Sequence, residues 1–450
     1  LFVESYTYES AQLQMVEESH ARHELGLAVL YALKEKFDVP GMEDRLLQVM
    51  EKSQAIIFRQ ELFRNQLAQF TDSSRLQYVI LQRQIGDVRQ QIALGGEADA
   101  QLALSAALNQ LLQERERLLA ALLASVAQVG QSSFTNPSTV RQVQAFIQAR
   151  PQTLFLQYFW GEEHLYILAI AADTFQIRQI EITPDLLRWQ EAAIQAQAQP
   201  AGHDATYFQS FIANRHEGYQ RLIEPVFPHD SIAHLIIVPS GPLIFTSPET
   251  YITHATNDSK ATYATLPYLL KSADIRYVYS PGLMLHPPVN QQAASAFALP
   301  YLGVAPAYGK EAGLRALGGG IDLIQWAADY LGGDRLMQQA ATKEAFGDKL
   351  ENQTLGVLHF HGHADTTQGS WLAFAPDKEA DDHLFFMQEL YGLSFRAQLI
   401  LLSACQSGIG KIVKGEGIMH LGRAMQLAGG ENIILQLWEA DEDATTVITR

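Results

Sequence analysis

The sequence contains very little cysteine, few positive charges and no long apolar run. Cys405 is the only cysteine in 450 residues, so no disulfide can form within the chain, and a reducing, cytoplasmic location is expected. No stretch of about eighteen residues is continuously apolar, which predicts that no segment spans a membrane. The chain has 49 Asp and Glu against 32 Lys and Arg, a net charge of −17, so neither nucleic acid nor an anionic membrane is expected as its main partner.

Apolar sequence, by contrast, is abundant. Hydrophobic residues make up 47% of the chain, and its length predicts two or three domains, each with a core of its own. The chain starts at Leu1 without a methionine or a signal-like segment, and a helical pattern is still under way at Arg450. We therefore expect a piece of a longer chain.

Residues 1–60 are predicted to be helical. Leu25, Val29 and Leu33 recur at a spacing of four, and Pro40-Gly41 separates them from a second apolar stripe. A helical pair of this size needs neighbours to bury its apolar face, so residues 1–60 would end an array of helical repeats. A plain helical hairpin without a recognition role is the alternative.

Residues 61–131 are predicted to form a long antiparallel helical hairpin, and residues 132–150 a linker. Gly95-Gly96 separates the two helices of the hairpin, and Arg115 interrupts the apolar seam of the second helix. The seam consists of Leu104, Leu108, Leu111, Leu118, Leu122 and Val126. The hairpin is either a packed strut or a lever and partner surface.

Strands alternate with helices in the rest of the chain, which predicts an α/β fold with parallel or mixed sheets. Residues 151–295 contain no cysteine and no His-Gly-His cluster, so we interpret them as a structural half. Residues 296–450 form the half that carries the chemistry. Its predicted elements are strands at Tyr301–Ala305 and Asn432–Leu437, helices at Ile321–Leu331, Thr342–Leu350 and Gly417–Ala428, a hairpin at Ser370–Phe386 and a helix from Asp441.

The stretch from Leu355 to Cys405 organises this half. It opens with an apolar run that ends in His359-Phe-His361-Gly-His363 and closes with another that ends in Ser-Ala-Cys405. Each run reads as a buried strand of a parallel sheet. Because ligands and chemistry gather at the carboxyl ends of such strands, His363 and Cys405 would supply a base and a thiol nucleophile.

These motifs resemble those of the CHAT domain, a family of caspase-like cysteine peptidases that is often fused to tetratricopeptide repeats. The family's usual patterns are His-x-x-Gly-His-Gly and Leu-Ser-Ala-Cys-Glu-Thr-Gly. The resemblance extends over roughly Pro151 to Arg450 and includes Gly415-Glu-Gly417 and Leu437-Trp-Glu-Ala-Asp441. Two residues depart from the pattern, Ala364 in place of glycine and Gln406 in place of glutamate.

The resemblance implies two caspase-like halves and endopeptidase cleavage through an acyl-enzyme on Cys405, with His363 as base and then acid. The backbone N–H groups of Ala364 and Cys405 would form the oxyanion hole. Asp441 matches a position that lines a pocket for a basic side chain in the related separases, so cleavage after Arg or Lys is expected. Asp441 would equally suit the N-terminus of the following helix.

The resemblance also implies a protein substrate, no cofactor, and activation by a protein partner that binds the N-terminal repeats, in a bacterial defence or cell-death pathway. The main alternative is a catalytically silent scaffold that binds proteins. A weaker alternative is a metal site formed by His359, His361 and His363 with Asp365 or His383. It would leave the cysteine motif without a role.

Overall fold

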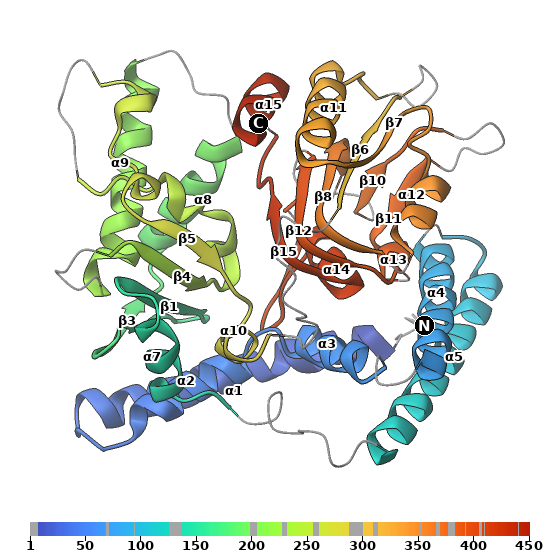
Figure 1. The fold of residues 1–450 in the computed structure, drawn as a ribbon. Coiled ribbons are helices and arrows are strands. Elements are labelled where there is room, and N and C mark those ends of the chain that lie inside the picture. Colours follow the sequence, from blue (N-terminus) through green and yellow to red (C-terminus); the bar gives the residue numbers. More distant parts are fainter. Residues whose placement is uncertain are drawn as a thin grey trace.

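The computed structural model describes most of the chain, and its helices and strands form a helical region followed by two α/β parts (Figure 1). The described residues are 8–68, 72–93, 95–125, 137–198, 205–226, 232–254, 261–287, 300–308, 314–351, 353–365, 370–376, 383–391, 393–404, 407–408, 410–439 and 441–450. Cys405, Gln406 and Val126 lie outside them. No helix of the described part is both long and apolar enough to cross a membrane.

The described residues of the helical region form five helices, and the first three run beneath both α/β parts in Figure 1. They are α1 (Tyr8–Glu35), α2 (Met42–Lys52), α3 (Ile56–Ala68), α4 (Asp72–Ala93) and α5 (Ala98–Ser125). Gly41 adopts a left-handed conformation with φ of 77° and ends the turn before α2, as the Pro-Gly break predicts. α4 and α5 pack against each other, and Arg115 of α5 is buried against Glu61 of α3.

The first α/β part contains a mixed five-stranded sheet in the order β3-β2-β1-β4-β5. β1, β4 and β5 are parallel, whereas β2 and β3 are antiparallel to their neighbours. Its elements are α7 (Val140–Gln148), β1 (Thr153–Trp160), β2 (His164–Ile170), β3 (Phe175–Glu181), α8 (Pro184–Ala198), α9 (Ala205–Leu222), β4 (His234–Val238), β5 (Asp274–Tyr277), α10 (Pro281–Leu285) and 3-10 turns at Glu224–Val226, Gly241–Phe245, Pro248–Thr250, Tyr263–Thr265 and Leu269–Lys271.

The second α/β part contains an entirely parallel five-stranded sheet in the order β15-β12-β8-β6-β7. Its elements are β6 (Tyr301–Pro306), α11 (Gly318–Leu331), β7 (Gly333–Gln338), α12 (Lys343–Leu350), β8 (Thr354–Gly362), α13 (Met387–Leu390), β12 (Arg396–Ala404), α14 (Leu421–Ala428), β15 (Gly430–Leu435) and α15 (Glu442–Thr449). Two small sheets accompany it, β9 (Ala364–Asp365) with β10 (Trp371–Ala373) and β11 (Leu384–Phe386), and β13 (Lys411–Val413) with β14 (Gly417–Met419).

Helices pack through apolar side chains on the faces of both sheets. α1, α2 and α7 pack on one face of the first sheet, and α8 with α9 on the other. On the second sheet, α12, α13 and α14 cover one face, while α11 covers only the part of the other face near β6, β7 and β8. The uncovered part of that face, at β12 and β15, borders the space between the two sheets, where Ile434 is 58% exposed.

Buried carboxylates attach the helical region to the first sheet. Glu24 of α1 accepts hydrogen bonds from the three consecutive N–H groups of residues 162–164, in the turn between β1 and β2. Glu51 of α2 accepts from the N–H groups of Ser138 and Gly282. The two carboxylates therefore supply acceptors to backbone N–H groups in a turn and at the start of a helix, where secondary structure leaves donors unpaired.

Two sequence predictions need correction, and one strand was not predicted. Leu25 and Val29, predicted to form a packing stripe, are 69% and 52% exposed. Residues 417–419 belong to β14 rather than to the helix predicted over Gly417–Ala428, because they pair with β13. β7 was not predicted at all. It is an edge strand with mostly exposed side chains, so it lacks the apolar run that identifies a buried strand.

Candidate active site

The two apolar runs of the central stretch lie side by side and end at the same level. β8 and β12 are adjacent and parallel, and their register pairs His361 with Ser403 and Gly362 with Ala404. His363 follows immediately after β8. Ala404 is the last residue of β12 and the last described residue before Cys405.

A backbone carbonyl determines the tautomer of His363. Its Nε2 lies 2.8 Å from the carbonyl oxygen of Arg315, in the segment between β6 and α11. A carbonyl oxygen can only accept, so Nε2 must carry the proton. In the neutral imidazole Nδ1 is then the unprotonated nitrogen and the one that can accept a proton. The contact involves the backbone of Arg315 and not its side chain. The sequence therefore gave no sign of this contact.

Tyr308 contacts the same histidine through its hydroxyl and its ring. Its hydroxyl accepts a hydrogen bond from the backbone N–H of His363 at 3.0 Å and donates one to the carbonyl of Ala373 at 3.3 Å. The phenol ring also lies against the imidazole, with 4.9 Å between the ring centroids. Tyr308 follows β6 at a buried position, and nothing in the sequence distinguishes it from an ordinary core aromatic residue.

Ala364 lies in β9, opposite Leu372 of β10. The neighbouring residue, His363, is bonded to β10 through its carbonyl, which accepts from Ala373 N–H at 2.9 Å. Since hydrogen-bonded and non-hydrogen-bonded pairs alternate along an antiparallel ladder, the N–H of Ala364 points away from β10. Ala364 does not have a positive φ, so the glycine that is usual at this position is not required by the backbone.

His359 and His361 are core residues. His359 contacts the Tyr301 hydroxyl through Nδ1 and the Ser403 hydroxyl through Nε2, and burial lowers its pKa to about 3. His361 is 4% exposed and packs against Gly320 at the start of α11, and its pKa is also lowered, mainly by burial. Within the residues that the structure describes, no three His, Cys, Asp or Glu side chains converge closely enough to hold a metal ion.

Asp441 is the N-cap of α15. Its exposed carboxylate accepts a hydrogen bond from the N–H of Ala444 at 3.0 Å. The next residue, Glu442, accepts from the N–H of Gly319 at 2.7 Å and so joins the first turn of α15 to that of α11. The capping role that the sequence allowed is therefore present, and the same carboxylate faces a cleft.

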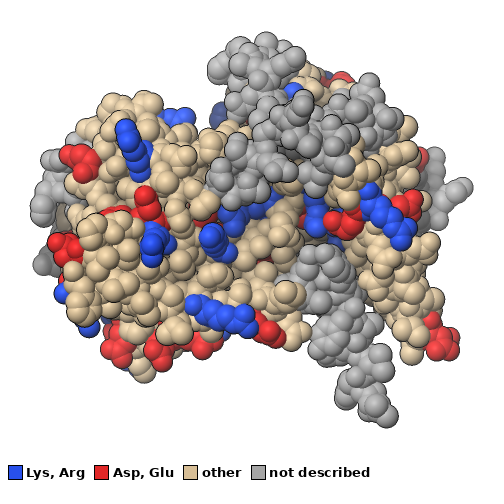
Figure 2. Space-filling view, turned by 90° about the horizontal axis from the view of Figure 1, so that it is seen from below, with Lys and Arg blue, Asp and Glu red and all other residues tan. Residues whose placement is uncertain are grey.

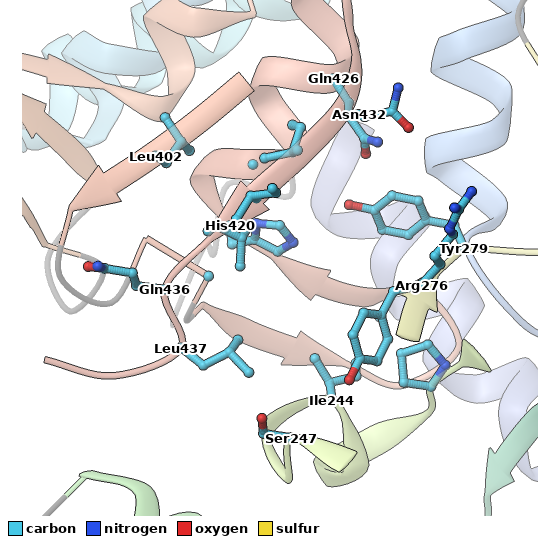
Figure 3. A pocket seen from close by; sticks show the side chains of 18 of the residues that line it. Ile244, Ser247, Arg276, Tyr279, Leu402, His420, Gln426, Asn432, Gln436 and Leu437 are labelled. Atoms are coloured by element: carbon cyan, nitrogen blue, oxygen red, sulfur yellow. The ribbon is translucent and has the colours of Figure 1, made fainter. Parts of the chain in front are cut away.

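That cleft separates the two α/β parts and has a volume of about 3250 Å³. His363, Ala364 and Asp441 all line it, as do Ser403 and Gly408 on either side of Cys405. Figure 3 shows a part of it, in which Ile244, Ser247, Arg276 and Tyr279 of the first part face His420, Gln436 and Leu437 of the second. The cleft extends along the uncovered face of β12 and β15.

The segment that follows Cys405 is anchored to the helical region. Glu416, between β13 and β14, accepts hydrogen bonds from the N–H groups of Ile57 and Phe58 at the start of α3, at 2.8 and 2.7 Å. It also pairs with the buried guanidinium of Arg423, which lies over the Phe58 ring. Gly415 and Gly417 on either side have φ of 78° and 95°, so the Gly-Glu-Gly sequence was the signal for this turn.

Charge on the surface is mixed. In the view of Figure 2, Lys and Arg side chains are interspersed with Asp and Glu over the described part of that face. At the mouth of the cleft the second part contributes Glu431, Glu439, Asp441, Glu442 and Asp443. Basic side chains line the same cleft, among them Lys271, Arg276, Arg315 and Lys414.

Comparison with known protein families gives a match to the CHAT domain over residues 216–450, which is more than half of the chain. The matched range includes the whole second sheet together with His363, Cys405 and Asp441. It begins within α9, later in the chain than the start near Pro151 that the sequence motifs suggested. No curated protein matches the chain.

Proposed function

This chain belongs to the CHAT domain family, and we propose that it is a cysteine endopeptidase with Cys405 as nucleophile and His363 as base. The observation that carries the proposal is the pairing of Gly362 with Ala404, because it brings the ends of β8 and β12, which precede His363 and Cys405 in the sequence, to one edge of a parallel sheet. The tautomer of His363 adds to this support, since its unprotonated Nδ1 is available to a neighbouring thiol.

In the proposed reaction, Nδ1 of His363 takes the proton of the Cys405 thiol, and the thiolate attacks the carbonyl carbon of the scissile peptide. The resulting oxyanion accepts hydrogen bonds from the backbone N–H groups of Ala364 and Cys405. The imidazolium then protonates the leaving amine, and the peptide bond breaks to leave a thioester on Cys405. Water, deprotonated by the same imidazole, hydrolyses the thioester and releases the acid product.

Asp441 would set the specificity of the cleavage. A carboxylate on the cleft wall can form two parallel hydrogen bonds with a guanidinium, a geometry that selects arginine and, less strongly, lysine. One oxygen of Asp441 accepts from Ala444 N–H, and carboxylate oxygens have lone pairs for more than one donor. Capping of α15 and recognition of a basic side chain are therefore compatible in the same residue.

The helical region would bind a regulatory protein partner. Met15, Leu25 and Val29 of α1 are exposed apolar side chains, 70%, 69% and 52% exposed, of the kind that a stacked helical repeat or a partner would cover. In this proposal residues 1–60 end a repeat array of the tetratricopeptide type, and residues 61–131 pack against it.

The two α/β parts would be the two halves of a caspase-like pair. Residues 151–295 would form the non-catalytic half and residues 296–450 the catalytic half.

The test is hydrolysis of a peptide library that varies the residue before the cut. The wild-type protein, Cys405→Ala and His363→Ala would be compared, with and without any available partner protein. We expect cleavage after Arg and Lys, lowered at least about a thousandfold in both variants. Cleavage that survives Cys405→Ala would refute the proposed nucleophile. Absence of cleavage in every condition would favour the scaffold alternative.

A further inference from the structure

The Tyr308 hydroxyl occupies the place of a hydrogen bond between strands. His363 and Ala373 face each other in the register that pairs Ala364 with Leu372. In an antiparallel ladder such a pair normally exchanges two direct N–H···O=C bonds. One of them is present, from Ala373 N–H to the His363 carbonyl at 2.9 Å. The other is interrupted, because the Tyr308 oxygen lies between the His363 N–H and the Ala373 carbonyl, at 3.0 and 3.3 Å.

We infer that Tyr308 is a positioning residue for the proposed base, and that its hydroxyl holds His363 away from β10 and toward the cleft. The inference rests on the proposed peptidase function. A direct bond would draw the His363 nitrogen to about 2.9 Å from the Ala373 oxygen. With the hydroxyl between them the two backbones are spread on one side, which turns the His363 imidazole and the neighbouring Ala364 N–H outward.

Three features keep the hydroxyl in this place. Tyr308 is buried, and its ring lies against the imidazole that it positions. Both of its hydrogen-bond partners are backbone groups, so no side-chain rotation can release them. Gly362 leaves the necessary room, since a Cβ there would come within 2.6 Å of the Tyr308 oxygen. The glycine of the His-Gly-His motif therefore leaves room for this hydroxyl and for the Phe360 ring, which lies 2.8 Å from the same point.

The hydroxyl stays protonated at working pH. Burial raises the pKa of Tyr308 well above its usual value, and only the protonated hydroxyl can donate to the Ala373 carbonyl while it accepts from His363. Arg315, which accepts from Nε2, is seven residues beyond Tyr308 in the same connection from β6 to α11. Two residues of this connection therefore bind His363: Tyr308 binds its backbone N–H, and Arg315 binds its imidazole ring.

The variant Tyr308→Phe distinguishes a positioning role of Tyr308 from a purely structural one. Without the hydroxyl, the His363 N–H and the Ala373 carbonyl can approach and form the direct ladder bond, so the fold keeps its hydrogen bonds. His363 would withdraw from the cleft as this happens. We therefore expect a folded protein whose base is misplaced.

Cys405 supplies the measurement, because it is the only thiol in the chain. The rate of alkylation by iodoacetamide would be followed from pH 5 to pH 9 in the wild type, His363→Ala, Tyr308→Phe and Tyr301→Phe. Tyr301→Phe is the matched control, because it removes a buried hydroxyl that contacts His359 in the core of the same sheet. Circular dichroism and thermal melting would report the fold of each variant.

We expect the wild type and Tyr301→Phe to alkylate at acidic and neutral pH, where an isolated thiol, with a pKa of about 8.5, reacts slowly. Tyr308→Phe should lose at least about tenfold in rate at pH 6.5, its profile should shift toward that of His363→Ala, and its melting temperature should fall no further than that of Tyr301→Phe.

The outcomes separate the inference from the proposed function. Identical profiles in the wild type and His363→Ala would refute the Cys-His pair itself. A wild-type profile in Tyr308→Phe, with His363→Ala shifted, would refute the role of Tyr308 and leave the pair standing. If Tyr308→Phe does not fold, Gly362→Ala displaces the hydroxyl instead, and a wild-type profile in that variant would also overturn the inference.

Discussion

Glu416 and Arg423 form an ion pair that is almost completely buried, with 1% and 2% of the two residues exposed. The Glu416 carboxylate also accepts the N–H groups of Ile57 and Phe58, two of the donors that the first turn of a helix leaves without an internal partner. A negative charge is favourable at this end of a helix. The helical region is therefore joined to the segment that follows the proposed nucleophile by one carboxylate.

Loss of this carboxylate should destabilise the protein strongly. Glu416→Gln leaves the guanidinium of Arg423 buried without a charged partner, and we expect the free energy of unfolding to fall by about 3 kcal/mol or more. Lys414→Ala is the control, because Lys414 of the same turn pairs with Glu162 at an exposed site and should cost less than about 1 kcal/mol. Equal effects in urea unfolding would contradict the assignment.

Two substitutions of Asp441 separate its capping role from its proposed recognition role. Asparagine caps a helix about as well as aspartate, so Asp441→Asn should change the stability by only a few tenths of a kcal/mol, whereas Asp441→Ala should cost about 1 kcal/mol. Both should lower kcat/KM for peptides with Arg before the cut by at least about tenfold, because both remove the charge. A retained preference for Arg in Asp441→Asn would exclude the carboxylate as the specificity group.

Ala364→Gly should restore the family's usual residue without a gain in activity. Ala364 does not have a positive φ, so the alanine is not strained, and its N–H already points away from β10. We expect kcat/KM within about twofold of the wild type and a loss of stability of about 0.5–1 kcal/mol from the added freedom of glycine. A large increase in kcat/KM would show that the alanine limits the activity.

Acid should destabilise the fold through buried histidines. Burial is the main cause that lowers the pKa of His20 to about 4 and that of His420, like His359, to about 3. Below about pH 6.5 the unfolded chain binds protons at these residues and the folded chain does not, so stability falls as the pH decreases from 7 toward 4. Each residue contributes up to about 2 kcal/mol between pH 7 and pH 5.

His20→Phe provides the test of this pH dependence. The His20 ring stacks on Phe159 with 4.5 Å between centroids, an arrangement that a phenyl ring can retain. The difference in unfolding free energy between pH 7 and pH 5, from urea titrations, should be smaller in the variant by up to about 2 kcal/mol. The same difference in both proteins would mean that His20 does not remain neutral in the fold.

The spacing of apolar residues identified strands and helices correctly where most of the element is buried. The runs at β8 and β12 were identified as buried strands of a parallel sheet with polar ends, because they are apolar over most of their length. β7 and the β13–β14 hairpin were missed, since exposed or short strands carry no such signal. Leu25 and Val29 satisfied the helical period and yet face outward, because the period does not specify what covers a stripe.

The sequence by itself determined the order of the parts and the parallel sheet, and it pointed to His363 and Cys405 as the proposed reacting pair, because these depend on periodicity and on residue type. Only the tertiary structure decided how His363 is held. Arg315 acts through its carbonyl, Tyr308 through a hydroxyl between two backbones, and Glu416 through the end of a helix more than 350 residues earlier. Contacts to backbone groups across such separations leave no pattern in the side chains, so three-dimensional packing alone reveals them.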